Sequence, residues 1–286
     1  MRRCRQPAAG SPSLGVVTDL SDAIAQDKRP QKNPGLRQLR LLARRLPWWA
    51  EALVAVAFYW LYDAVQALTQ SDADEATAHG ADIVHAEKFL HIWAEPDVNH
   101  WATHHNWLAL IAGYDYAIAH VFITALVLAY LWWRHPRVEV PLRNAIVGMS
   151  LVALVVYWQY PVSPPRFVVG GMTDTLISND ILGARHVHEG LVNLYAAMPS
   201  LHVAWAIWCA AALVLALRSR WRHLAWLYPL WTTFVVVSTA NHYFLDAVAG
   251  ALLAVVPLVL VTSHSRRSVG SRANSTSGRP SPNPLP

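Results

Sequence analysis

Two short polar segments, each at the edge of a long apolar run, hold the residues most able to do chemistry. Residues 199–202 read Pro-Ser-Leu-His, and residues 242–246 read His-Tyr-Phe-Leu-Asp. His242 and Asp246 are four residues apart, so on a helix the carboxylate can orient the imidazole and raise its basicity. An imidazole held in this way can act as a nucleophile or a base. Because polar groups at membrane depth are costly, the two segments predict a functional site.

A third polar segment, Gln159 to Arg166, follows another apolar run. A guanidinium can bind two phosphoryl oxygens at once, which makes Arg166 a candidate phosphate ligand. If the three segments face the same side of a membrane, three helix ends meet in one interfacial plane. Their side chains, together with the free N–H groups at a helix start, can then form one anion site.

The composition is that of an integral membrane protein. Of 286 residues, 54% are hydrophobic and only 14% are charged, and there are 14 tryptophans. Apolar runs close to the ~20 residues needed to span a bilayer recur along the chain. We place six of them, at about 48–70, 106–133, 143–160, 200–217, 223–241 and 243–263. The sequence therefore predicts an all-α, polytopic protein with six transmembrane helices.

The basic residues predict its orientation. Of the 23 Lys and Arg residues, 20 lie in the N-terminal segment, between runs two and three, between runs four and five, or in the C-terminal tail. The positive-inside rule then places both termini in the cytoplasm and the active site at the extracytoplasmic ends of helices 3, 4 and 6. We expect a multi-pass protein of the plasma membrane, and the excess of Arg over Lys hints at a bacterial source. The positive charge favours anionic lipid and gives no support for a nucleic-acid partner.

Three regions follow from these patterns. Residues 1–46 are predicted to be a disordered, basic cytoplasmic segment, in which 36–46 form either a short helix on the inner leaflet or a solvated leader. Residues 47–263 form the membrane domain, and 264–286 a disordered cytoplasmic tail. Cys4 lies in a polar tail and Cys209 inside an apolar run, so no disulfide is predicted.

Two outer connections and several histidines receive simple interpretations. Residues 71–105 predict one amphipathic surface helix, and 161–197, rich in Pro and Gly, an irregular connection resembling a lid. His120 is predicted to be a satisfied packing residue. His100, His104 and His105 fit one helix face, but no partner ligand accompanies them, so no metal site is predicted.

Taken together, the three segments resemble the membrane branch of the type 2 phosphatidate phosphatase superfamily. The second motif of that family is Pro-Ser-Gly-His, which residues 199–202 match except at Leu201. The third motif ends in His-x-x-x-Asp, matched by His242 and Asp246. Such motifs, in order and in topological context, are a specific signal.

The chain departs from the family pattern at two places. The first motif is Lys, six residues, Arg; Gln159 stands at the lysine position and Arg166 keeps the arginine. The third motif usually begins Ser-Arg, where this chain has Val235 and Val236. These departures, with the His-Tyr-Phe-x-Asp form of the third motif, resemble the subgroup of inositol phosphorylceramide synthase and its bacterial relatives. The resemblance covers about residues 50–263.

The resemblance implies a role for each matching residue. His242 is the expected nucleophile, forming a phosphohistidine, with Asp246 holding its other ring nitrogen. His202 is the expected general acid for the leaving alkoxide. The expected phosphate ligands are Arg166, the Ser200 side chain and the N–H groups at the start of span four, including that of Leu201.

Two cations of the family pattern are missing, so other donors are needed. Gln159, Asn241 and Tyr243 are candidates, and Arg185, His186 and His188 of the outer loop could also reach the phosphate. The implied chemistry needs neither a metal nor another cofactor, because phosphoryl transfer depends mostly on positioning and charge stabilisation.

The leading functional hypothesis is an integral membrane lipid-phosphate phosphatase. The first alternative is a lipid head-group phosphotransferase of the inositol phosphorylceramide synthase type, which would use the same residues. The second is a non-catalytic lipid transporter or scaffold on the same fold. The expected partners are a phosphorylated lipid substrate and the lipid bilayer.

Overall fold

A computed structural model describes residues 46–69, 73–184 and 195–277 of the chain, and most of these residues lie in helices. The pairing of Val162 with Ala196 is an isolated bridge, and the described ranges contain no β-strand. The all-α class is therefore confirmed. The elements are α3 (Trp48–Thr69), α4 (Ala73–Phe89), α5 (Glu95–His104), α6 (Asn106–Tyr114), the π-helical turn η1 (Asp115–Ala119), α7 (His120–Arg134), α8 (Pro136–Gln159), α9 (Pro165–Val168), α10 (Thr175–Ser178), the 3-10 turn η2 (Ile181–Gly183), α11 (Leu201–Ala216), the 3-10 helix η4 (Arg220–Trp226), α12 (Leu227–Ser238) and α13 (Phe244–Ser277).

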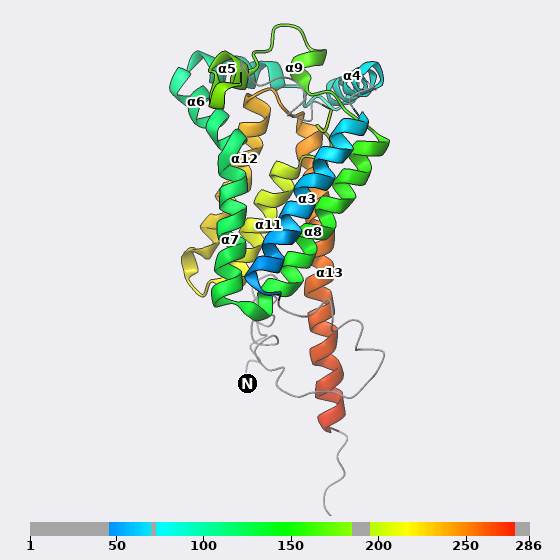
Figure 1. The fold of residues 1–286 in the computed structure, drawn as a ribbon, viewed down its shortest axis with the longest axis vertical. Helices are drawn as coiled ribbons and strands as arrows, with labels where there is room; N and C mark the ends of the chain where they lie inside the picture. The colour runs from blue at the N-terminus through cyan, green and yellow to red at the C-terminus, as the bar shows by residue number, and fades with distance from the viewer. Residues whose placement is uncertain (1–45, 70–72, 185–194, 278–286) are drawn as a thin grey trace, which may run out of the picture.

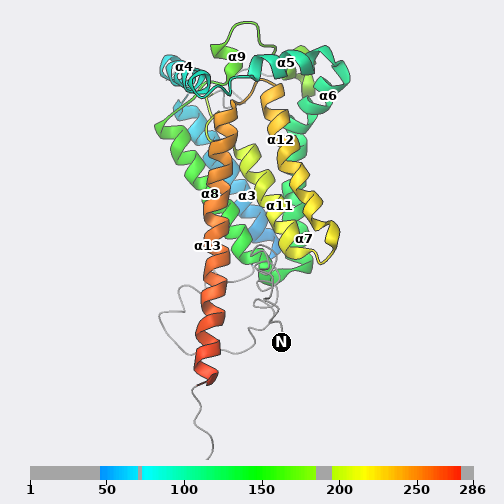
Figure 2. The ribbon, with the colours of Figure 1, turned by 180° about the vertical axis from the view of Figure 1, so that it is seen from behind.

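The long helices run side by side as a bundle, and short helices lie across one end of it (Figure 1). We call α4, α5 and α9 the cap. Viewed from behind, α13 continues past the opposite end of the bundle (Figure 2). Helical structure therefore extends to Ser277, into the segment that the sequence predicted to be a disordered tail. The predicted N-terminal segment lies outside the described residues, apart from its last residue, Leu46.

Each of the six predicted apolar runs contains a helix. Two helical segments, Asn106–Arg134 and Val138–Gln159, are long and apolar enough to cross a membrane, judged by length and composition. The apolar helices in the other runs are shorter, among them Leu201–Ala216 and Phe244–Leu260. The six-span topology therefore stays a prediction.

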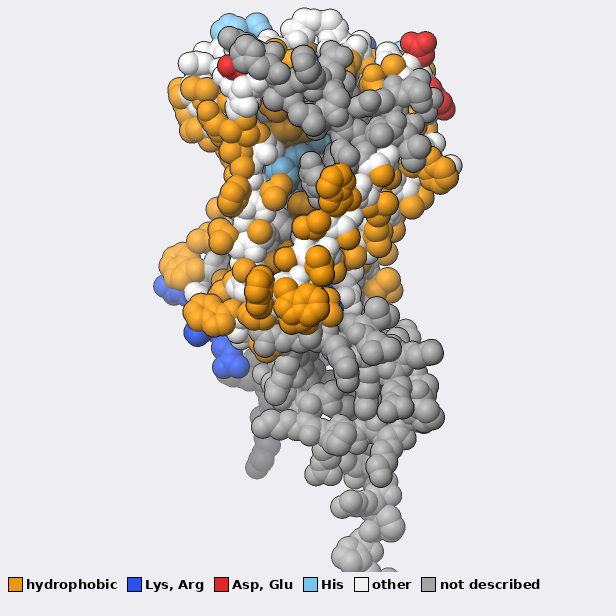
Figure 3. Space-filling model, viewed as in Figure 1, with side chains coloured by type: hydrophobic (Ala, Val, Ile, Leu, Met, Phe, Trp, Pro, Cys, Tyr) orange, Lys and Arg blue, Asp and Glu red, His pale blue; other side chains and the backbone are white. Residues whose placement is uncertain are grey.

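The side of the bundle is covered by exposed hydrophobic side chains, as Figure 3 shows. Phe122, Leu126, Leu252 and Leu260 are each more than 60% exposed. Basic side chains gather at the end opposite the cap in this view, and acidic ones at the cap (Figure 3). An apolar girdle between polar ends is the pattern expected for a protein in a bilayer.

Helix α11 lies at the centre of the bundle and packs against α7, α8, α12 and α13. Its sequence is apolar all round, and it is rich in alanine, which allows neighbouring helices to approach closely. Trp208 is fully buried there, and its indole N–H donates to the Leu142 carbonyl of α8 at 2.8 Å. This packing fixes the position of α11, whose first residue, Leu201, follows the capping residue Ser200.

Two loop segments are tied together beneath the cap. Helix α8 ends before Pro161, and the chain then runs irregularly, as the prolines predicted. The Val162 N–H donates to the Tyr195 carbonyl at 2.8 Å, and the Ala197 N–H donates to the Val162 carbonyl at 3.2 Å. Helix α13 approaches the same region closely because Gly250 has no Cβ; an added Cβ would collide with the Ser200 carbonyl oxygen.

The prediction of one surface helix between residues 71 and 105 was wrong. The structure has two, α4 and α5, because the chain turns after Phe89 and His91 adopts a positive φ of 58°. The turn lets both helices face the start of α13, which a single straight helix would not allow.

The cap holds the start of α13 through two buried carboxyl groups. Glu87 of α4 accepts a hydrogen bond from the Leu245 N–H at 2.7 Å, and Glu95 of α5 accepts one from the Phe244 N–H at 2.9 Å. Neither glutamate is exposed to solvent. Their carboxyl oxygens accept hydrogen bonds from N–H groups that the start of a helix otherwise leaves unpaired. Burial, and secondly the adjoining Glu95 carboxyl, raises the pKa of Glu87 to about 9.

The orientation can be checked with single cysteines. Ser178 near the cap and Ser219 at the opposite end are both exposed, so each can be changed to cysteine in a Cys4→Ser background. Cys209 is buried and should not react. We expect a membrane-impermeant maleimide to label the Ser178→Cys variant in intact cells and the Ser219→Cys variant only after lysis. The reverse pattern would contradict the predicted orientation.

The Glu87 carboxyl predicts a pH-dependent stability. Its pKa is about 9 in the folded protein and near 4.5 when unfolded, so folding keeps a proton that the unfolded chain releases between these values. Stability contributed by this group is present below pH 4.5 and is lost as the pH rises toward 9, by up to about 1.4 kcal/mol per unit. The Glu87→Gln variant should have a flatter profile of unfolding temperature against pH. Glu75→Gln, an exposed change on the same helix, should keep the wild-type profile, and equal slopes in all three proteins would contradict the assignment.

Candidate active site

The structure brings His202, His242 and Asp246 together beneath the cap. His202 lies in the first turn of α11, His242 in the loop before α13, and Asp246 in the first turn of α13. The two imidazole rings are 5.6 Å apart between centroids and meet edge to face. His242 and Asp246 are buried, whereas His202 is partly exposed. Figure 3 shows histidine surface at the bottom of a hollow on this side of the bundle.

One hydrogen bond selects the tautomer of a neutral His242 side chain. Its Nδ1 lies 2.7 Å from the Ala197 carbonyl oxygen and 3.4 Å from Oδ2 of Asp246. Both neighbours only accept hydrogen bonds in their usual forms, so in the neutral imidazole Nδ1 carries the proton and Nε2 keeps its lone pair. The sequence suggested Asp246 as the partner of this nitrogen. The structure adds a closer partner, a backbone carbonyl that no sequence pattern marks.

The loop before α13 is held on several sides. The N–H groups of Asn241 and His242 both donate to the Val236 carbonyl of α12. Ala240 has a φ of 59°, a conformation that glycine usually supplies at helix ends. Asp246 closes the loop by accepting from the Tyr243 N–H at 2.9 Å. The position of His242 is therefore set by the end of α12 and the start of α13 together.

The start of α11 contributes a helix N-terminus beside the histidines. The Ser200 hydroxyl is buried and caps the helix by accepting a hydrogen bond from the Val203 N–H at 3.5 Å. The backbone N–H of Ser200 donates to the Asp246 carbonyl. Ser200 is thus used structurally. The N–H groups of Leu201 and His202 belong to the first turn, where a helix has no internal partners for them.

Arg166 is engaged by protein groups. Its Nε lies 2.9 Å from Oδ2 of Asp174, and its Nη1 donates to the Asn241 side chain and, at 3.3 Å, to the Ala240 carbonyl. The guanidinium therefore reaches the loop that carries His242, and its charge is balanced by a carboxylate. The sequence had suggested Arg166 as the lone cation of a phosphate pocket; Asp174 was not anticipated.

The remaining suggested phosphate donors lie elsewhere or outside the described residues. Gln159 is exposed at the end of α8, and no hydrogen bond joins it to the described histidines. Tyr243 is buried, and its hydroxyl donates to the Ser163 carbonyl at 3.1 Å. Arg185, His186 and His188 lie outside the described residues. Within the described ranges, no group of His, Cys, Asp or Glu side chains could hold a metal ion.

Tyr116 and His120 belong to the site, although the sequence had suggested only a packing role for His120. Tyr116 stacks on His202 at 4.3 Å between centroids, and His202 Nε2 lies 3.3 Å from the Tyr116 carbonyl oxygen. The His120 ring lies 3.9 Å from that of His202. Both residues flank or lie in the π-helical turn η1, and such turns are frequent at functional sites. The sequence signal that could have identified them is the presence of two polar aromatic residues, four positions apart, within an apolar run.

An apolar groove of about 870 Å³ runs along α11, α12 and α13 close to this cluster. Val203 and Phe244 line it, and they are close in sequence to His202 and His242. Ile207, Leu230 and Val248 continue the apolar wall along the bundle. Such a groove offers a surface for a hydrocarbon chain, although His202 and His242 do not themselves line it.

Comparisons with known proteins identify a relative and a family. The chain is 26% identical over 173 residues to the inositol phosphorylceramide synthase catalytic subunit aur1 of Schizosaccharomyces pombe. The match covers 55% of this chain and 41% of the yeast protein, less than half the length of that relative. No solved structure matches the chain.

The family comparison covers the part of the chain that forms the site. The model of the PAP2 superfamily matches residues 81–260, well over half of the chain. The matched region begins in the cap, contains His202 and His242, and extends along α13. The chain therefore belongs to the PAP2 superfamily.

Proposed function

We propose that the chain is a membrane enzyme that cleaves a phosphoester bond of a lipid through a phosphohistidine. The observation that carries this proposal is the tautomer selected for His242, whose Nδ1 proton is donated to the Ala197 carbonyl. The unprotonated Nε2 is then a nucleophile with a defined direction. Family membership and the similarity to a lipid-modifying enzyme support a phosphatase or phosphotransferase.

The first half of the reaction forms the covalent intermediate. Nε2 of His242 attacks phosphorus, an N–P bond forms, and the P–O bond to the lipid alcohol breaks. The positive charge that develops on the imidazole is stabilised by Asp246, 3.4 Å from Nδ1. His202, in its imidazolium form, supplies the proton on Nδ1 to the departing alkoxide and is left as a neutral imidazole. Its Nε2 keeps its own proton, which it donates to the Tyr116 carbonyl oxygen at 3.3 Å.

The second half of the reaction releases the phosphoryl group. An incoming hydroxyl attacks phosphorus, His202 takes its proton, and the N–P bond to His242 breaks. Phosphoryl oxygens are held by the first N–H groups of α11, from Leu201 on, and by Arg166 if its pairing with Asp174 loosens. Orientation by Asn241 keeps the guanidinium beside the loop.

The identity of the incoming hydroxyl separates the two forms of the proposal. With water, the protein is a lipid-phosphate phosphatase, the leading hypothesis from the sequence. With a lipid or polyol hydroxyl, it is a head-group phosphotransferase, and the similarity to the yeast synthase subunit favours this second form. In both forms, the predicted orientation places the reaction at the outer face of the plasma membrane.

Product analysis with the purified full chain distinguishes these forms. Radiolabelled phospholipids and lipid phosphates are supplied with and without hydroxylated acceptors, and both released phosphate and new phospholipids are measured. Phosphate release alone identifies a phosphatase, and a new phospholipid that requires an acceptor identifies a transferase. Absence of both across the substrates, with lipid binding retained, would favour a non-catalytic transporter or scaffold and overturn the proposal.

The rate lost on replacing His202 is expected to increase with the basicity of the leaving group. In a single turnover that follows release of the alcohol, and so reports only the first half of the reaction, the His202→Asn variant should lose roughly 10²- to 10⁴-fold in rate on an alkyl phosphate, which needs a proton on its alkoxide. It should lose much less on an aryl phosphate with an acidic phenol, which leaves without a proton. His223→Asn, an exposed change at the far end of the bundle, is the control and should behave as wild type. An equal loss on both substrates would show that His202 is not the acid.

The pairing of Arg166 with Asp174 predicts opposite effects for two variants. Arg166→Lys keeps the charge but loses the forked contacts, and we expect orthovanadate inhibition to weaken ~10-fold or more. Asp174→Asn keeps the helix cap that Oδ1 provides to α10 and removes the competing charge, so vanadate should bind several-fold more tightly. Asp97→Asn, an exposed charge change on α5, controls for net charge. Unchanged inhibition in both Arg166 and Asp174 variants would exclude Arg166 from the phosphate site.

A further inference from the structure

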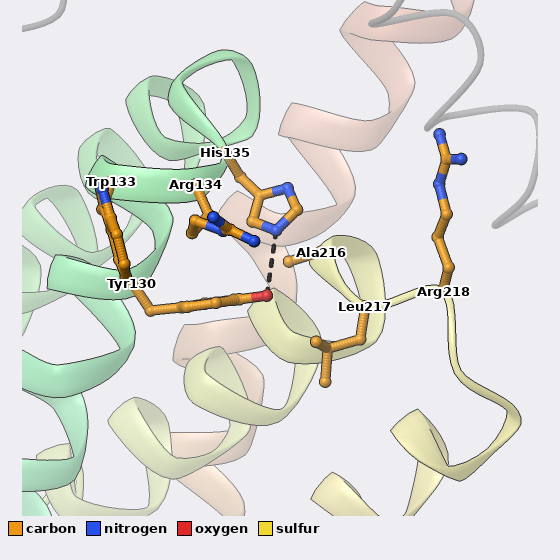
Figure 4. Close-up of a pocket in the computed structure, with 7 residues that line it drawn as sticks. All are labelled: Tyr130, Trp133, Arg134, His135, Ala216, Leu217 and Arg218. Carbon is orange, nitrogen blue, oxygen red and sulfur yellow. Dashed lines mark hydrogen bonds between the residues drawn. The ribbon is translucent and has the colours of Figure 1, made fainter.

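A second cavity, lined largely by polar groups, lies at the end of the bundle opposite the cap, far along the helices from His202 and His242. Its volume is about 540 Å³, and it lies between the corner joining α7 to α8 and the end of α11 (Figure 4). Tyr130, Arg134 and His135 line it from one side, and Leu217 and Arg218 from the other. The cavity takes no part in the chemistry proposed for the histidines.

Its two arginines have no anionic partner within the described ranges. Arg134 and Arg218 make no ion pair there. Arg143, at the same end of the bundle, pairs with both Glu51 and Glu139. Burial lowers the pKa of His135, and the charges of Arg134 and Arg218 lower it further. With both of these guanidinium groups in its lining, the cavity is positively charged. The positive charge of the cavity therefore favours binding of an anion.

The other groups of the cavity suit a phosphate at a membrane boundary. His135 and Tyr130 form a hydrogen-bonded pair at 3.2 Å, and each has hydrogen-bonding capacity toward a ligand. The Arg134 guanidinium lies over the Trp133 ring at 5.2 Å, an arrangement typical of the membrane interface. The carbonyl end of α11 disfavours an anion, but Arg222 donates to the Leu217 carbonyl at 3.4 Å and offsets part of this effect.

We propose that this cavity binds the phosphate of an anionic phospholipid in the leaflet opposite the histidine cluster. A lipid fits better than a free ion, because the cavity opens at the ends of apolar helices and Trp133 and Leu217 offer apolar surface to the glycerol backbone. Basic cavities between membrane helices commonly hold lipid head groups. The predicted orientation makes this the cytoplasmic leaflet, and the proposal is independent of the reaction at His242.

The test measures lipid binding directly. Purified full-length protein in detergent is titrated with phosphatidylglycerol or phosphatidylcholine, and bound lipid is counted by native mass spectrometry. We expect one phosphatidylglycerol to bind preferentially, and Arg134→Gln or Arg218→Gln to weaken its binding ~10-fold. Arg220→Gln is the matched control, because Arg220 is also exposed at this end and lies over Trp221 at 5.0 Å but does not line the cavity.

Three outcomes would overturn the proposal. Equal weakening by Arg220→Gln would mean diffuse attraction to the basic end of the protein. Equal binding of phosphatidylcholine would remove the need for an anion. Displacement of the lipid by an equal concentration of inorganic phosphate would mean that the cavity holds a free ion. A monodisperse elution profile for every variant, with wild-type unfolding temperature in zwitterionic lipid, confirms that the comparison is made between folded proteins.

Discussion

The hydrogen bond between His242 Nδ1 and the Ala197 carbonyl is the interaction on which the proposed chemistry depends. A neutral imidazole has two tautomers, and only one leaves Nε2 free to attack. A backbone carbonyl cannot rotate away or change its protonation state, so it selects that tautomer more rigidly than a side chain would. Asp246, at 3.4 Å, then adds the negative charge that a phosphorylated imidazole needs.

Much of the fold serves to keep this bond in place. Ala197 is held because Val162 pairs with the segment 195–197, and His242 is held because its loop is tied to the end of α12. Gly250 allows α13 to approach the start of α11 closely. The buried carboxyl groups of Glu87 and Glu95 secure the first turn of α13 from above. The cap is therefore part of the support of the site as well as its cover.

The sequence predicted the features that follow from local patterns. Apolar runs gave the all-α class and the approximate helix positions, and the histidine motifs gave the three residues that meet beneath the cap. The motifs could predict this meeting because each lies at the end of an apolar run, and helix ends on the same side of a bundle lie in one plane. The family and its inositol phosphorylceramide synthase-like relative were also identified from these motifs, and the comparisons confirm them.

What the sequence did not predict depends on contacts between distant segments. The Ala197 carbonyl, the Asp174 partner of Arg166 and the contact of His120 with His202 each join residues more than seven positions apart, and a backbone acceptor has no side-chain signature. The π-helical turn at Asp115–Ala119 adds a change of register that no propensity indicates. The break between α4 and α5 was missed because His91 is not a glycine, although it adopts a positive φ.

The central claim is tested most directly by looking for the phosphoryl group on His242 during turnover. The purified enzyme is mixed with a lipid substrate, quenched rapidly in alkali, which preserves phosphohistidine, and digested for mass spectrometry. The account predicts phosphate on Nε2 of His242, and none in a His242→Ala variant, which should not turn over. Turnover by wild-type enzyme with phosphate on another side chain, or with His242 unmodified at every quench time, would contradict it.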